Sequence, residues 1–230
     1  AQQIENIRKT VDEKLQDTLE TKLTQSFGLV NERLEQVYKG LGEMQTIASN
    51  VGDLKKILSN VKTRGILGEV QLGGILEQIL SPEQYEENVA TRPGSSERVE
   101  FAVKLPGSGA GETVYLPIDA KFPGDTYSAL QEAYDTGDKA EIELARKRLL
   151  TRIASEGKDI CDKYIAVPYT TDFAVMFLPF EGLYAEVVRN GMIEMLQRKY
   201  RVTIAGPTTM AALLNSLQMG FNTLAIEKRS

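Results

Sequence analysis

The chain has 230 residues with no histidine and one cysteine, and its 32 acidic residues outnumber 27 basic ones. The missing histidine excludes a Ser-His-Asp triad, a Cys-His pair, an imidazole-ligated zinc ion and a histidine general base. Any catalysis must therefore use carboxylates, lysines, hydroxyl groups or backbone atoms, with a hard metal ion bound through oxygen where a metal is needed. The single thiol, Cys161, lies in helical sequence, which favours a buried and unreactive side chain.

Two parts of the chain differ in composition. Residues 1–62 contain no proline and equal numbers of acidic and basic residues, whereas all eight prolines lie at or beyond Pro82. The acidic excess therefore belongs to residues 63–230. We expect a boundary near residue 62, with an N-terminal stem over 1–62 and a folded domain over 63–230.

The stem has the pattern of a long helix. From Val30 to Val61, apolar residues recur at steps of four and three, which is the seam of a coiled coil. Such a stripe needs a partner, so we expect a homo-oligomer formed through this coiled coil or a returning helix. The alternative is a single solvated helix.

The remaining residues alternate between helical and strand patterns. Val99–Leu105 and Val114–Phe122 read as a strand hairpin, and the nearly all-apolar segment Asp172–Leu178 reads as a central strand covered on both faces. A further strand is expected over 201–205. Helices are expected over 64–80, 125–134, 139–164 and 181–199, and from Thr208 onward. This order predicts an α/β fold in which helices flank a mixed sheet.

Charged residues inside the predicted strands mark a candidate site. Asp119 and Lys121 are two residues apart and so project from one face of their strand, and Glu100 can join them from the preceding strand. Glu69 adds a carboxylate beside Gly68 on the preceding helix. Carboxylate oxygens suit Mg²⁺ or Mn²⁺, and a neighbouring lysine can hold water or stabilise phosphoryl charge. The alternative is a surface ion pair between Asp119 and Lys121.

A second set of residues is a candidate for DNA contacts. Arg198, Lys199 and Arg201 form a local basic cluster, and Thr208 can cap the last helix beside free N–H groups that suit a phosphate. Each feature also has a structural explanation, as a solvated helix face or a simple cap. The acidic net charge argues against a broad basic surface.

Three segments taken together resemble the RmuC family of DNA recombination proteins. These are Arg64–Leu72, Val99–Gly107 and Ile118–Pro123, within a resemblance that covers about residues 60–230. The resemblance implies a restriction-endonuclease-like core of the PD-(D/E)xK type. It implies Glu69 as the helix carboxylate, Glu100 at the "PD" aspartate position, and Asp119 with Lys121 as the (D/E)xK pair. Glu100 departs from the family pattern because it replaces an aspartate and follows no proline, and Leu67 stands where the family often has tryptophan.

These observations lead to a hypothesis about function. We expect a bacterial DNA recombination protein that hydrolyses phosphodiester bonds of DNA, with Glu69, Glu100 and Asp119 holding Mg²⁺ or Mn²⁺ and Lys121 assisting. The alternative is a non-catalytic DNA- or protein-binding scaffold with a vestigial site. The sequence has no apolar run long enough to span a membrane, and we expect a cytoplasmic location. The helical pattern continues to the last residue, so we expect a longer protein. The resemblance to the RmuC family adds that, if a membrane anchor precedes Ala1, it would tether the domain to the membrane.

Overall fold

The computed structural model describes residues 61–107 and 112–227. Almost the whole predicted stem, residues 1–60, lies outside the described residues, so the coiled coil stays a prediction. Between Val61 and Glu227, no helix combines the length and the apolar sequence that crossing a bilayer requires.

The centre of the structure is a five-stranded mixed sheet. Its strands follow the order β1-β2-β3-β4-β5 in space as in sequence, with β1, β2 and β3 antiparallel and β3, β4 and β5 parallel. The strands are β1 (Tyr85–Val89), β2 (Val99–Pro106), β3 (Thr113–Ala120), β4 (Ala174–Phe177) and β5 (Val202–Ala205). The predicted α/β class and the β2–β3 hairpin are confirmed, and every residue of β4 is buried, as its apolar sequence predicts. The sequence does not predict strand β1, because its residues are mostly polar and only partly covered.

Six helices surround this sheet in the described part of the chain. They are α3 (Val61–Ile79), α4 (Gly124–Thr136), α5 (Lys139–Tyr164), α6 (Glu181–Arg189), α7 (Met192–Tyr200) and α8 (Pro207–Glu227), and a short 3₁₀ helix covers Pro82–Gln84. The single helix predicted over 181–199 is wrong. The chain breaks there because Gly191 adopts a φ of 72°, a left-handed conformation that other residues rarely adopt.

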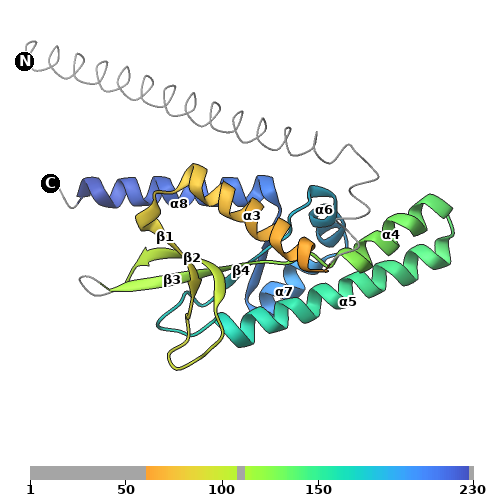
Figure 1. Ribbon diagram of the computed structural model, residues 1–230, viewed down its shortest axis with the longest axis horizontal. Coiled ribbons are helices and arrows are strands. Elements are labelled where there is room, and N and C mark those ends of the chain that lie inside the picture. Colours follow the sequence, from red (N-terminus) through yellow and green to blue (C-terminus); the bar gives the residue numbers. More distant parts are fainter. Residues whose placement is uncertain (1–60, 108–111, 228–230) are drawn as a thin grey trace, which may run out of the picture. The chain divides into compact units, whose positions relative to one another are not determined.

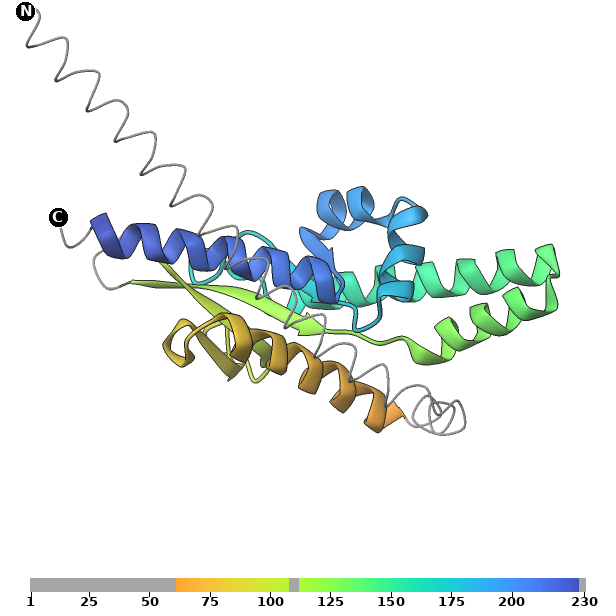
Figure 2. The same ribbon diagram turned by 90° about the horizontal axis from the view of Figure 1, so that it is seen from above.

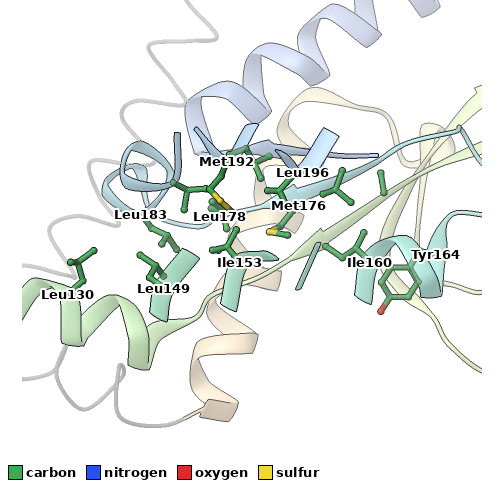
Figure 3. Close-up of a cluster of buried hydrophobic side chains, with 14 of the residues drawn as sticks. Leu130, Leu149, Ile153, Ile160, Tyr164, Met176, Leu178, Leu183, Met192 and Leu196 are labelled. Atoms are coloured by element: carbon green, nitrogen blue, oxygen red, sulfur yellow. The ribbon is translucent and has the colours of Figure 1, made fainter. Parts of the chain in front are cut away.

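Helices cover both faces of the sheet. Helices α3 and α8 lie side by side on one face and α5 lies across the other (Figures 1 and 2). The main core lies on the α5 side, where Met176 of β4 packs among Ile153 of α5 and Leu196 of α7 (Figure 3). On the opposite face, Gly73 of α3 lies against the ring of Phe101. Strand β3 is therefore enclosed between two helical layers, so a polar side chain at its end is largely withdrawn from water.

The contact between α5 and the core tests this packing. A Cβ added at Gly157 would lie 2.5 Å from Leu196 Cδ2, whereas one added at Gly74 of α3 would meet nothing within 4 Å. We expect Gly157→Ala to lower the free energy of unfolding by about 1 kcal/mol, because overpacking outweighs the gain in helix propensity. The matched change Gly74→Ala should raise it by about 0.5–1 kcal/mol. Urea unfolding measures both, and changes of the same sign would contradict the packing described.

Candidate functional site

The β2–β3 hairpin brings two carboxylates together. The antiparallel register pairs Phe101 with Ile118, so the next pair in register is Glu100 with Asp119. Glu100 Oε2 accepts a hydrogen bond of 2.8 Å from the backbone N–H of Ala120, which fixes the Glu100 side chain against the end of β3. The strand pairing therefore produces the convergence that the side-chain alternation predicts.

Asp119 is the most deeply buried member of this group. It is 1% exposed and, in register with Met176 of β4, faces the core beneath α5. Its Oδ2 atom lies 2.5 Å from Lys121 Nζ, but this oxygen has no hydrogen bond of good geometry to any described residue. Asp119 thus keeps one buried acceptor whose only compensation in this part of the chain is the charge of Lys121.

Lys121 directly follows β3 and is held by its backbone. Its N–H donates a 2.8 Å hydrogen bond to the carbonyl of Phe177 in β4, which continues the parallel pairing by one residue. Its side chain is 25% exposed. The ammonium group therefore lies between the buried carboxylate and the solvent, at the carboxyl end of the parallel strands.

Burial dominates the electrostatics of the carboxyl groups. It raises the pKa of Glu100 to about 8, and the charge of Asp119 adds to the shift while the Ala120 N–H opposes it. Burial likewise raises the pKa of Asp119, in spite of the nearby Lys121 ammonium. For Lys121, burial acts to lower the pKa, but attraction to Asp119 and the other nearby carboxylates outweighs it and the pKa is raised. Burial therefore disfavours the ionised form of both carboxyl groups, and a bound cation would stabilise that form.

Glu69 lies apart from the other two predicted metal ligands. It is an exposed residue of α3, next to Gly68, which packs on Ala120 on the face of the sheet opposite Asp119. Its charge is near enough to contribute to the raised pKa of Glu100. Among the described residues, no three acidic or cysteine side chains are close enough together to hold one metal ion. The structure therefore gathers Glu100, Asp119 and Lys121, and leaves Glu69 outside their cluster.

The residues at hand still fit a hard divalent cation. Mg²⁺ commonly keeps several waters and binds through one or two carboxylates rather than through a complete protein cage. Glu100 and Asp119 are neighbours in the β2–β3 register, and Asp119 Oδ2 is a buried oxygen whose partner in the described chain is the Lys121 ammonium. Because oxygen is the only donor type in this pair, the chemistry suits Mg²⁺ or Mn²⁺.

The predicted basic cluster lies elsewhere. Arg198 and Lys199 are in the last turn of α7, and Arg201 follows it, 3.7 Å from Asp172. All three are exposed and precede β5 at the amino end of the parallel strands, whereas Lys121 lies at the carboxyl end of β3. The structure does not bring this cluster together with the carboxylates.

The start of α8 differs from expectation. The sequence predicts Thr208 as the cap beside free N–H groups, but the N–H of Thr208 donates to Glu181 Oε1 at 2.7 Å. The capping hydroxyl belongs to Thr209, which accepts a 2.8 Å hydrogen bond from the Gly206 N–H. Glu181, the first residue of α6, already places its carboxylate at this end of α8. The Thr208 N–H is therefore not available to a phosphate.

Helix α5 adds two residues that sequence reasoning missed. The charge of Glu156 contributes to the raised pKa values of both Asp119 and Lys121. Tyr164 is buried, and burial together with the charge of Asp119 raises its pKa to about 12. For Glu156 a signal was present: it lies three residues after Ile153 and four before Ile160, which places a carboxylate on the apolar side of a helix.

Comparison with known proteins gives consistent matches over nearly the whole chain. A profile described as the RmuC family matches residues 2–230. A protein of Xylella fastidiosa (strain 9a5c) named DNA recombination protein RmuC homolog is 58% identical over 222 residues, which cover 96% of this chain and 49% of that protein. A protein of Chlamydia trachomatis with the same name is 28% identical over 205 residues, 87% of this chain and 44% of the relative. The chain thus spans about half the length of the curated relatives it matches. No solved structure matches it.

The raised pKa of Glu100 predicts a pH dependence of stability. A carboxyl group with a folded pKa of about 8 and an ordinary value of 4.5 favours folding while protonated, and this contribution is lost as the pH rises from 4.5 to 8. Glu100→Gln imitates the protonated form. The free energy of unfolding of Glu100→Gln relative to the natural chain should therefore increase between pH 5 and pH 8, by up to about 1.4 kcal/mol per pH unit.

Urea unfolding at the two pH values measures this difference. The control is Glu132→Gln, which changes an exposed carboxyl group of α4 in the same way. Parallel pH profiles for the natural chain and Glu100→Gln would show that Glu100 is ionised without cost in the folded protein.

Proposed function

The chain belongs to the RmuC family, and on that premise we propose that it is a DNA recombination protein whose residues 63–230 form a metal-dependent nuclease domain. The proposed reaction is hydrolysis of phosphodiester bonds in recombining DNA, at a site of the restriction-endonuclease-like PD-(D/E)xK type. The names of the curated relatives support the role in recombination. One observation carries the proposed chemistry: Glu100, Asp119 and Lys121 meet at the end of β3, where a buried carboxylate oxygen has only the Lys121 ammonium as its partner within the described chain.

Each residue has a proposed task. Asp119 and Glu100 would hold Mg²⁺ or Mn²⁺, which supplies an acidified water and offsets charge on a phosphoryl group. Lys121, partly exposed beside them, would orient that water or stabilise the negative charge that develops at phosphorus. Glu69 would contribute from α3 through waters of the ion, because it stands outside the carboxylate pair.

DNA contacts are proposed at the exposed basic cluster. Arg198, Lys199 and Arg201 would bind backbone phosphates, which supply most of the affinity in protein–DNA binding. These residues lie at the amino end of the parallel strands, whereas Asp119 lies at the carboxyl end. DNA bound at both places would therefore run along the length of the parallel strands. The acidic net charge confines such contacts to local clusters.

A non-catalytic scaffold is the second candidate, and one observation favours it. Lys121 is already paired with Asp119, and no cluster of three carboxylates exists in residues 61–107 and 112–227. In this alternative the domain binds DNA or a protein partner, and the charged residues at the end of β3 are a structural ion pair.

A cleavage assay separates the two candidates. The full chain is incubated with Mg²⁺ or Mn²⁺ and with single-stranded, duplex and branched DNA. We expect metal-dependent cleavage that falls by at least about 100-fold in Asp119→Asn and in Lys121→Met, because each removes charge that acts on the transition state.

The matched controls are Asp135→Asn and Lys139→Met, two exposed residues near the α4–α5 turn, and both should cleave like the natural chain. Cleavage that survives in Asp119→Asn and Lys121→Met would refute the assignment of the site. DNA binding without cleavage under any metal would support the scaffold.

The proposed phosphate contacts predict a change in salt dependence. The double variant Arg198→Gln/Arg201→Gln should bind duplex DNA of any sequence more weakly. The slope of log affinity against log salt should become shallower by about 0.9 for each phosphate that the variant no longer binds. Fluorescence anisotropy at several salt concentrations measures the slope, with Arg148→Gln, an exposed residue of α5, as the control. A slope unchanged from that of the natural chain would place the DNA elsewhere.

A further inference from the structure

We propose that the loop between α5 and β4, residues 165–173, is a platform for single-stranded DNA, on which the ring of Tyr169 stacks against a base while Arg92 and Arg201 bind the neighbouring phosphates. The inference rests on the proposed function, because it names the form of DNA that is bound at the amino end of the parallel strands. None of these three residues belongs to the segments that carry the resemblance to the RmuC family.

The first support is an aromatic ring that the fold leaves in contact with solvent. Tyr169 is 54% exposed, and Val167 of the same loop is 62% exposed. The hydroxyl of Tyr169 makes no hydrogen bond to the part of the chain that the structure describes, whereas the hydroxyl of the exposed Tyr134 donates to Glu186 at 3.1 Å. The ring of Tyr169 therefore offers an aromatic face to a ligand.

The second support is the hydrogen bonding that fixes the backbone beneath this ring. The N–H of Tyr169 donates to the carbonyl of Ala166 at 2.9 Å, and the hydroxyl of Thr170 accepts from the Ala166 N–H at 2.8 Å. The carbonyl of Tyr169 accepts a 3.0 Å hydrogen bond from the N–H of Tyr115 in β3. Because the loop is held in place before a ligand arrives, binding loses little conformational entropy.

The third support is a cation at each end of the loop. Arg92, from the loop between β1 and β2, donates from its guanidinium group to the carbonyl of Ile165 at 3.0 Å. At the other end, Arg201 lies 3.7 Å from Asp172. A neutral carbonyl leaves the charge of Arg92 uncompensated. The pair of Arg201 and Asp172 is largely exposed and therefore weak, so both arginines can bind a phosphate.

Two observations place these arginines within reach of one ligand. Ile165 and Asp172 are seven residues apart in sequence, so the backbone between them spans at most about 25 Å. Burial raises the pKa of Cys161 in the last turn of α5, and the charges of both Arg201 and Arg92 act against that rise. One strand of DNA can therefore contact both cations and the ring between them.

The combination of a ring with cations favours single-stranded over duplex DNA. In a duplex the faces of the bases are covered by their neighbours, and a basic surface binds the phosphates alone. In a single strand any base can stack on an aromatic side chain while basic residues bind the backbone. Tyr115, which pairs with Tyr169, precedes Asp119 by four residues of β3, or about 13 Å along a strand. Single-stranded DNA bound here can thus extend toward the proposed nuclease site.

Fluorescence anisotropy in the presence of EDTA tests the platform without cleavage. The full chain is titrated into a labelled oligothymidine and into a labelled duplex of the same length. Tyr169→Leu keeps an apolar side chain but removes the ring, so it should weaken binding to the single strand about tenfold and leave binding to the duplex unchanged. Tyr169→Phe keeps the ring and should bind like the natural chain. The control Val70→Ala, which shortens a similarly exposed apolar residue of α3, should change neither affinity.

Salt dependence tests the contribution of Arg92. In Arg92→Gln, the slope of log affinity against log salt for the single strand should become shallower by about 0.7, the value for one phosphate contact. The matched control is Arg98→Gln, because Arg98 is an exposed arginine of the same loop that donates to a different carbonyl, that of Asn88 in β1, at 2.8 Å. It should leave the slope unchanged. A natural slope in Arg92→Gln would overturn the assignment of Arg92 to the platform.

The outcomes separate this inference from the proposed function. Equal single-strand binding by the natural chain and Tyr169→Leu would overturn the platform and leave the exposed loop to a protein partner. Equal losses in Tyr169→Leu and Tyr169→Phe would mean that the hydroxyl rather than the ring binds DNA, which also overturns it. Natural protein that binds neither DNA would refute the proposed DNA contacts and this inference together. Single-strand binding that depends on the ring, without cleavage under any metal, would support the platform and refute the proposed nuclease alone.

Discussion

A carboxylate buried between a β-sheet and a helix is the constraint on which the site depends. Transfer of an isolated charge from water to such a place is costly, so the surroundings must supply a cation or a proton. For Asp119 the surroundings supply Lys121 from the same strand face, at 2.5 Å. For Glu100 they supply the Ala120 N–H and a pKa of about 8, so that this group carries a proton over much of the neutral range. In the described chain the Lys121 charge is the compensation for Asp119 Oδ2, and an oxygen of this kind suits a bound cation.

The layers of the fold create this environment. Helices α3 and α8 close one face of the sheet, and α5 with α7 closes the other, so that even the last residue pairs of β3 and β4 are withdrawn from water (Figures 1 and 2). The pairing changes from antiparallel to parallel at β3, which places a hairpin partner on one side of Asp119 and a buried parallel strand on the other. The site is consequently supported by rigid elements, which hold charged groups more reproducibly than loops do.

Two features of the composition, the absence of histidine and the excess of acidic residues, agree with the groups found at the end of β3. The charged groups that meet at the end of β3 are carboxylates and a lysine, the groups that remain for hydrolytic chemistry when imidazole is missing. The match to the RmuC family covers almost the whole chain, while the chain covers about half of its curated relatives. The acidic excess of residues 63–230 is compatible with a small cation site, and it limits DNA contacts to local groups such as Arg198 and Arg201.

The sequence by itself determined the local features of this protein. The period of two in a strand was enough to place Asp119 and Lys121 on one face and to bring Glu100 toward them, and apolar runs located β2, β3, β4 and most helices. It did not reveal β1, whose polar residues pair at a sheet edge, or the break at Gly191, which depends on one backbone conformation. Only the tertiary structure decided that Glu69 stands apart, that Arg198 lies toward the other end of the parallel strands, and that Gly157 of α5 lies close to Met176 of β4. The physical reason is that periodicity follows from backbone geometry within an element. The distance between charges on different elements follows instead from how those elements pack.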